Sequence, residues 1–200
     1  MGDFSQNGII SNLHDFGTKT TADIEKELVK FSKERKMELI LPSLYSELKG
    51  DALPNIVKQI SETKYLNHII VGLDKASKAE AVKAWKFFKK LNTPFTILWN
   101  DGPRLKKLHE ELKEKDLAPS EMGKGRNVWY CLGMCIARDE ARSVALHDCD
   151  IKTYDRRMLA KLFYPVVNPF FNFEFCKGYY PRISNGKMNG RVARLLVFPL

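Results

Sequence analysis

In the first three quarters of the chain, short continuous apolar runs alternate with segments in which apolar residues follow the period of a helix. Short apolar runs, typical of buried strands, stand at residues 38–41, 69–71, 95–99 and 143–147. A helical period predicts helices at 22–36, 51–63, 77–91, 103–117 and, after two glycines, 126–138. Repeated alternation of strand and helix predicts an α/β fold with a mostly parallel sheet and helices on both faces.

The pattern changes near residue 170. Phe171, Phe173 and Phe175 alternate with polar residues, which predicts a half-buried strand that continues toward residue 180. A turn follows at 185–190, and an apolar run closes the sequence. We therefore expect an N-terminal leader and helix at 1–37, a ligand-binding core at 38–165, and at 166–200 the start of a further region that continues in a longer parent chain.

Composition narrows the classes of partner. The 200 residues contain 33 Lys and Arg against 24 Asp and Glu, a formal net charge of +9, which favours an anionic partner. No apolar run is long enough to span a membrane, and the first residues do not have the pattern of a secretory signal. Four cysteines without a CxxC pair indicate a reduced, cytoplasmic protein, in which Cys131 and Cys135 act as small core residues.

The sharpest chemical signal is the pair of carboxylates Asp148 and Asp150. They follow the apolar strand at 143–147, and ligands of parallel α/β sheets bind beyond the carboxyl ends of strands. Residues two apart on extended backbone point the same way, so the two carboxylates form one pair of hard oxygen donors. Such donors suit Mg²⁺ or Mn²⁺ on a diphosphate, although Asp is also common in turns that carry no function.

Two other segments are candidates for nucleotide contacts. Gly123, Lys124 and Gly125 precede a helix, where backbone can approach a phosphate closely and a lysine can supply charge. Leu41-Pro42-Ser43-Leu44 is interpreted as a strand that ends in a rigid turn, and Asp74 ends the next strand. Each of these features alone is equally typical of an ordinary loop.

Taken together and in order, the motifs resemble those of a family. Leu41-Pro42-Ser43-Leu44, Gly123-Lys124-Gly125, Asp148-Cys149-Asp150 and Asn189-Gly190-Arg191-Val192 are similar to the motifs of retaining GT-A glycosyltransferases that form glucosyl-3-phosphoglycerate. The resemblance covers essentially the whole chain. It implies the GT-A fold, a Rossmann-like architecture of nucleotide-diphospho-sugar transferases, and transfer of a hexose from UDP-glucose or GDP-mannose to 3-phosphoglycerate or a similar small anionic acceptor.

The resemblance also implies roles for individual residues. Pro42, Ser43 and Leu44 would line the nucleotide site, with Asp74 nearby, and Gly123 would belong to the same site. Lys124 would approach the nucleotide, Asp148 the ribose, and Asp150 would coordinate the metal, so that Asp148, Asp150 and Lys124 form the catalytic group. Gly190 and Arg191 would bind the acceptor, Arg191 through its planar fork of donors.

The sequence departs from the family pattern at three points. Ser46 stands where the family has an acidic residue, and Glu47 follows one position later. Ala193 replaces a threonine expected near the acceptor phosphate, and a histidine that is the family's third metal ligand would lie beyond Leu200. Similar enzymes are often homodimers, and their same-face mechanism needs no carboxylate nucleophile.

Other classes stay open. A nucleotidylyltransferase would need a basic, glycine-rich loop directly after the first strand, where this chain has only Lys49 and Gly50. A nucleic-acid-binding domain would use the lysines of 77–91 together with Arg104, Lys106 and Lys107. Trp85 and Phe88 are expected to face the core and the lysines the solvent, so we expect that nucleic acid is not a partner. A nucleotide-binding fragment without catalytic activity is the third alternative.

Overall fold

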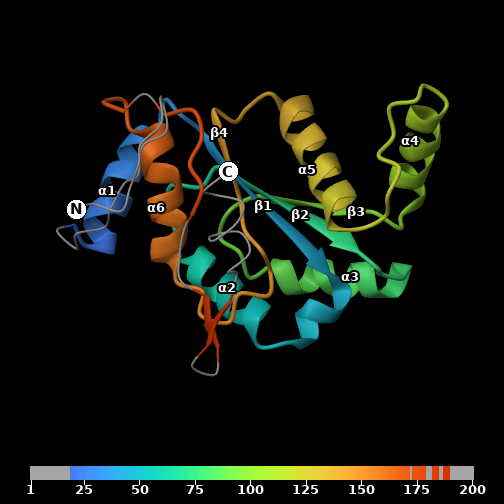
Figure 1. The fold of residues 1–200 in the computed structure, drawn as a ribbon, viewed down its shortest axis with the longest axis horizontal. Coiled ribbons are helices and arrows are strands. Elements are labelled where there is room, and N and C mark those ends of the chain that lie inside the picture. The colour runs from blue at the N-terminus through green and yellow to red at the C-terminus, as the bar shows by residue number, and fades with distance from the viewer. Residues whose placement is uncertain (1–18, 172, 179–181, 185–186, 190–200) are drawn as a thin grey trace.

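The computed structural model describes residues 19–171, 173–178, 182–184 and 187–189. Its central sheet has four strands, β1 (Met37–Leu44), β2 (His68–Asp74), β3 (Phe95–Trp99) and β4 (Ser143–Leu146). The strand order is β3-β2-β1-β4, and every neighbouring pair is parallel (Figure 1). The predicted parallel α/β architecture is therefore confirmed.

Helices cover both faces of this sheet. They are α1 (Thr21–Phe31), α2 (Ala52–Ser61), α3 (Lys78–Phe88), α5 (Lys124–Arg138) and α6 (Arg156–Val167), with the short 3₁₀ helix η1 (Tyr45–Lys49) after β1. Helix α4 (Pro103–Lys113) has no buried residue and is joined to α5 by a hydrogen bond between His109 and Tyr130. Leu39 and Leu41 of β1 face a core shared with α1, α2 and α6, whereas Ile40 faces Cys131 and Cys135 of α5. The two cysteines are core residues, as predicted.

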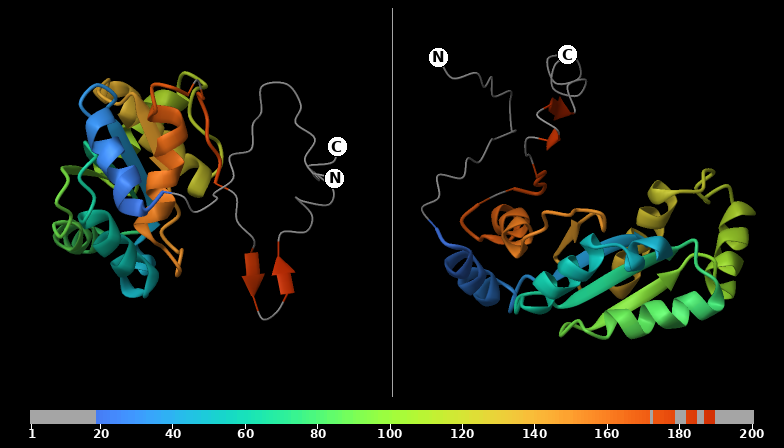
Figure 2. Two further views of the ribbon diagram at one scale, coloured as in Figure 1. Left: turned by 90° about the vertical axis from the view of Figure 1, so that its left-hand side faces the viewer. Right: turned by 90° about the horizontal axis from the view of Figure 1, so that it is seen from below.

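Helices α1 and α6 lie side by side against one end of the sheet (Figure 1 and Figure 2). Helix α6 was not predicted, although Asp155 caps it by accepting from the Arg157 amide at 2.7 Å. Leu159 and Phe163, four residues apart, form its buried stripe. Pro165 in its last turn interrupted the sequence pattern of a helix.

Strand β1 runs through Pro42 to Leu44, so the prediction that Pro42 ends the strand is wrong. The Ile40 carbonyl accepts from the His147 amide, so the backbone groups of Ile40 point toward β4. The backbone nitrogen of Pro42, two residues later, points the same way. Pairing with β4 stops at Ile40, and a proline two residues later therefore leaves no ladder hydrogen bond unmade.

Two predictions about aromatic residues are also wrong. Trp85 is 47% exposed, because Ala84 and Phe88, not Trp85, form the buried stripe of α3. Within 170–171 and 173–178 the chain forms no strand, and Phe170 and Phe175 are 89% and 80% exposed. A period of two stabilises a strand only where a neighbouring strand pairs with it.

Further on, β5 (Arg182–Ser184) and β6 (Lys187–Asn189) form an antiparallel pair.

In the described part of the chain, no helix is both long enough and apolar enough to cross a membrane.

Candidate functional site

The carboxyl ends of the parallel strands bring most of the predicted site residues to one edge of the sheet. In the register of β1 and β2, Leu44 pairs with Asp74 and Ser43 with Leu73. Strand β4, on the other side of β1, ends at Leu146, two residues before Asp148. Segments far apart in sequence thus meet where ligands of such sheets bind.

Lys124 and Asp148 are joined directly. The Lys124 ammonium donates a hydrogen bond to Asp148 Oδ1, and the two side chains are 56% and 47% exposed. Lys124 opens α5 because Gly123 before it has φ = +143°, a backbone conformation that favours glycine. The structure therefore brings together two of the three residues predicted to form the catalytic group, and both remain open to solvent.

The segment that carries Asp148 and Asp150 is held in the protein by the buried residues between and beside them. His147 and Cys149 are buried, whereas Asp148 is half-buried and Asp150 exposed, so inward and outward residues alternate. His147 Nδ1 is hydrogen-bonded to Tyr154 Oη at 3.0 Å. Burial lowers the pKa of His147 to about 4, so the ring is neutral at pH 7. This buried contact, which the sequence did not point to, joins the two ends of the segment that carries both aspartates.

A second contact that the sequence did not predict holds α5 against β2. The Asn127 side-chain amide donates to the Gly72 carbonyl of β2 at 2.8 Å, and Asn127 is buried. A Cβ on Gly72 would lie 1.8 Å from Asn127 Oδ1 and 2.6 Å from Cys131 Sγ. Because only glycine fits there, α5 can approach the sheet closely, and its first residue, Lys124, reaches the edge where Asp148 lies.

Ser43 and Asp74 are more enclosed than their predicted roles suggest. Both are buried, Ser43 to 1% exposure and Asp74 to 5%. The Ser43 hydroxyl donates to the Leu44 carbonyl at 3.0 Å, and Asp74 Oδ1 accepts from the Lys75 amide at 3.1 Å. Each side chain thus first stabilises the turn that ends its own strand.

Glu47 is an acidic residue of this edge that has no predicted role. It lies in η1, directly after β1, and its Oε2 accepts from the Leu44 amide at 3.0 Å. The sequence signal was present, because Glu47 stands next to the position where the related motif carries an acid. At the end of β3, the side-chain amide of the buried Asn100 has no hydrogen-bond partner among the described residues, whereas its backbone N–H donates to the Leu73 carbonyl at 2.9 Å.

Asp148 and Asp150 supply hard oxygen donors of the kind that Mg²⁺ and Mn²⁺ prefer. Across the described ranges, no group of three or more His, Cys, Asp or Glu residues gathers in a way that could hold a metal ion. The predicted acceptor residues Gly190 and Arg191 lie outside the described residues. The donor chemistry of the aspartate pair therefore fits a divalent ion, as part of a ligand set.

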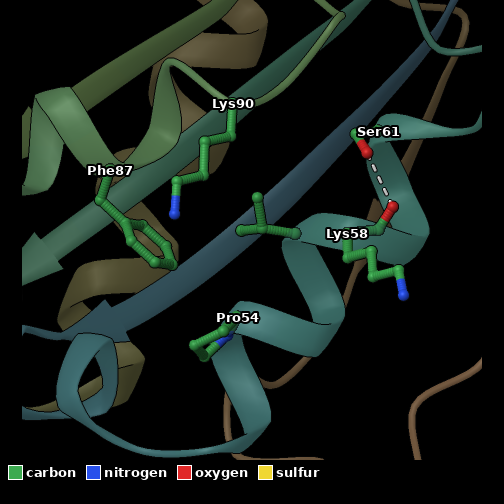
Figure 3. A pocket seen from close by; sticks show the side chains of 6 residues that line it. Pro54, Lys58, Ser61, Phe87 and Lys90 are labelled. Atoms are coloured by element: carbon green, nitrogen blue, oxygen red, sulfur yellow. Dashed lines mark hydrogen bonds between the residues drawn. The ribbon is translucent and has the colours of Figure 1, made fainter.

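A hollow of about 280 Å³ lies elsewhere, between α2 and the end of α3 (Figure 3). It is lined by Pro54, Val57, Lys58, Ser61, Phe87 and Lys90. None of the residues predicted for the site is among them, so the candidate site is an open edge of the sheet and not this hollow.

Comparisons with known proteins point in one direction. The chain is 44% identical to the glucosyl-3-phosphoglycerate synthase of Persephonella marina over 200 residues, which is all of this chain and 49% of that protein. It is 37% identical to the protein of the same name from Methanococcoides burtonii over 194 residues, 96% of this chain and 47% of that protein. The chain thus spans about half the length of the curated relatives it matches. The resemblance predicted from the motifs is confirmed.

Among solved structures, the chain is similar to a crystal structure of glucosyl-3-phosphoglycerate synthase from Mycobacterium tuberculosis in complex with Mn²⁺, UDP and glucosyl-3-phosphoglycerate. The TM-score is 0.47 and the sequence identity 16%, with 76% of this chain and 45% of that chain covered. No family model matches the chain.

Proposed function

We propose that the chain carries the nucleotide-sugar-binding half of a metal-dependent hexosyltransferase of the GT-A type. The donor is UDP-glucose or GDP-mannose, and the acceptor is 3-phosphoglycerate or a similar small anion. The observation that carries this proposal is the 44% identity to a glucosyl-3-phosphoglycerate synthase along all 200 residues, which include every motif at the candidate site.

The geometry of the edge supports a division of roles. Lys124 and Asp148 lie within hydrogen-bonding contact and are open to solvent, so a nucleotide can reach both. Pro42, Ser43 and Leu44 end β1 beside them, and Asp74 is paired with Leu44. In this proposal the β1 end and Asp74 line the base and ribose site, and Asp148 accepts from the ribose.

The divalent ion belongs at Asp150, the more exposed of the two aspartates. When bound, Mg²⁺ or Mn²⁺ supplies positive charge that stabilises the departing diphosphate. Lys124 adds a second positive charge from the protein itself, at the amino-terminal end of α5, where the helix dipole also favours an anion. Transfer with retention leaves the acceptor oxygen on the face of the anomeric carbon from which the diphosphate departs.

The remaining parts of the proposal concern the acceptor and the surroundings. Gly190 and Arg191 bind the acceptor, and the acceptor region begins near residue 166. The protein acts in the cytoplasm, forms a homodimer and does not use nucleic acid as a partner. The cytoplasmic location is proposed from the four cysteines, which include no CxxC pair.

The test is a thermal-shift series with UDP-glucose, GDP-mannose, GDP-glucose and ADP-glucose, each with and without Mn²⁺. A specific donor at a hundred times its Kd adds about 2.7 kcal/mol to the free energy of unfolding, which raises the Tm by several degrees. Asp150→Ala should remove the metal-dependent part of the shift and leave the unliganded Tm near that of the parent protein. Glu34→Ala, an exposed acid in the turn before β1, should behave like the parent. If no nucleotide gives a metal-dependent shift, the proposal is wrong.

A further inference from the structure

Glu47 lies directly after the carboxyl end of β1, at the edge of the sheet where the candidate site is found. It is half-buried in η1, and its carboxylate closes the turn after β1 through the Leu44 amide at 3.0 Å. The residue therefore has a fixed position at the strand end and is not a freely moving surface acid. Its neighbours in space come from β1, from the start of α5 and from the segment after β4.

Electrostatic interactions tie Glu47 to that site. Burial raises the pKa of the Glu47 carboxyl, and the nearby charge of Asp150 raises it further. The Leu44 amide, the Ser43 hydroxyl and the Lys124 ammonium act in the opposite direction. The Glu47 carboxylate thus interacts electrostatically both with Asp150, the proposed metal ligand, and with Lys124, the proposed nucleotide-binding lysine.

The balance of charge at this edge is unfavourable for a bare diphosphate. Asp148 pairs with the Lys124 ammonium, and Glu47 interacts electrostatically with both Lys124 and Asp150, so three carboxylates contribute negative charge near Lys124. Negative charge repels the anion until a divalent cation offsets it. Removing one of the three charges should therefore change how strongly the cation and the nucleotide depend on each other.

We infer that Glu47 couples nucleotide binding to the divalent cation: its charge weakens binding of a metal-free nucleoside diphosphate and strengthens binding of the metal-bound form. The inference rests on the proposed function. Glu47 acts as a positioning residue in this scheme, because it shapes the turn after β1 and the local charge without being assigned a contact to the sugar.

Glu47→Gln separates the charge from the hydrogen bond. The glutamine amide oxygen can still accept from the Leu44 amide, so the turn is kept while the charge is lost. The measurement is the ratio of the Kd values for UDP, and separately for GDP, in EDTA and in saturating Mn²⁺, by calorimetry at pH 8. We expect this ratio to fall roughly fivefold in Glu47→Gln, with tighter binding in EDTA and weaker binding in Mn²⁺.

Two further variants make the result specific. Glu34→Gln makes the same charge change at the opposite edge of the sheet and should leave the ratio unchanged. Glu47→Ala also removes the hydrogen-bond acceptor and should lower the Tm further than Glu47→Gln does. An unchanged ratio in Glu47→Gln, or equal shifts of both Kd values, assigns Glu47 a structural role only and overturns the inference. If the parent protein binds neither nucleotide, the proposed function fails and the inference fails with it.

Discussion

His147 is a buried residue that directly precedes Asp148 and is hydrogen-bonded within the segment that carries both predicted site aspartates. Its ring is bonded to Tyr154, and burial lowers its pKa from 6.5 to about 4. In the unfolded chain the same ring has its ordinary pKa, so as the pH falls the unfolded state binds the proton first. The contribution of the neutral His147 ring to the free energy of unfolding is therefore fully present above pH 6.5 and is lost between pH 6.5 and about 4.

Over that range we expect the free energy of unfolding to fall by up to about 3 kcal/mol because of His147. Urea unfolding at pH 7.5, 6 and 5 measures the slope. Burial also lowers the pKa of His68, and the carboxylates titrate too, so the informative quantity is the difference between the parent protein and His147→Gln. Equal slopes in the two proteins would show that protonation of His147 does not control stability.

The ion pair of Lys124 and Asp148 should matter for binding and hardly at all for stability. Both side chains are about half exposed, and exposed pairs contribute about 0–1 kcal/mol. Lys124→Met is therefore expected to change the free energy of unfolding by less than about 1 kcal/mol while weakening UDP binding at least tenfold. Lys107→Met, which breaks a similar exposed pair with Glu111, is the matched control. A large loss of stability without a loss of affinity would make Lys124 structural.

At the scale of elements, the approach of α5 to β2 decides whether Lys124 reaches the sheet edge. Gly72→Ala places a methyl group into Asn127 and Cys131, and we expect it to destabilise the fold by about 2–4 kcal/mol. Gly133→Ala, on the open side of α5 with no atom within 4 Å of the added Cβ, should be neutral or stabilising by up to about 1 kcal/mol. Thermal unfolding of the two variants compares them directly, and similar Tm values would contradict this account.

The same scale shows what the sequence could predict. Strands β1 to β4 and helices α1 to α5 follow from apolar periods, because each of these segments carries its own pattern. Their arrangement does not, since Gly72 and Asn127 meet only in three dimensions. Helix α6 was missed because Pro165 hides its pattern, and Trp85 was placed inward because its spacing from Phe88 also suits a core position.

The same distinction applies to the candidate site. That Asp148 and the end of β1 lie at one edge could be predicted, because strand ends of a parallel sheet share one edge, and Lys124 at the start of α5 contacts Asp148 there. The contacts that hold them could not, because Tyr154, Asn127 and Glu47 are ordinary residues in sequence whose partners are fixed by tertiary packing. Glu47 is the clearest example. Its position beside Ser46, where the related motif carries an acid, is visible in the sequence, whereas its electrostatic interactions with Asp150 and Lys124 depend on tertiary packing.

For the whole molecule, the net charge of +9 has two competing interpretations. Our proposal assigns a small part of it to a nucleotide sugar and the rest to solvated surface. The exposed Trp85 complicates this, because Lys89 Nζ lies 4.3 Å from its ring centre and further lysines share the exposed surface of α3. An aromatic ring among lysines is also the kind of surface on which single-stranded nucleic acid stacks.

The two interpretations differ in what Trp85→Ala does. If the surface is merely solvated, single-stranded DNA binds no tighter than about 10 μM at physiological salt, binding weakens steeply between 50 and 200 mM salt, and Trp85→Ala changes little. If bases stack on Trp85, the variant loses about 1–3 kcal/mol of DNA affinity, tenfold or more, while UDP binding is unaffected. Fluorescence anisotropy with a labelled oligonucleotide measures both. We expect the first result, because the Lys89 ammonium already lies over the Trp85 ring. Submicromolar DNA binding that depends on Trp85 would instead assign the basic face of α3 to nucleic acid.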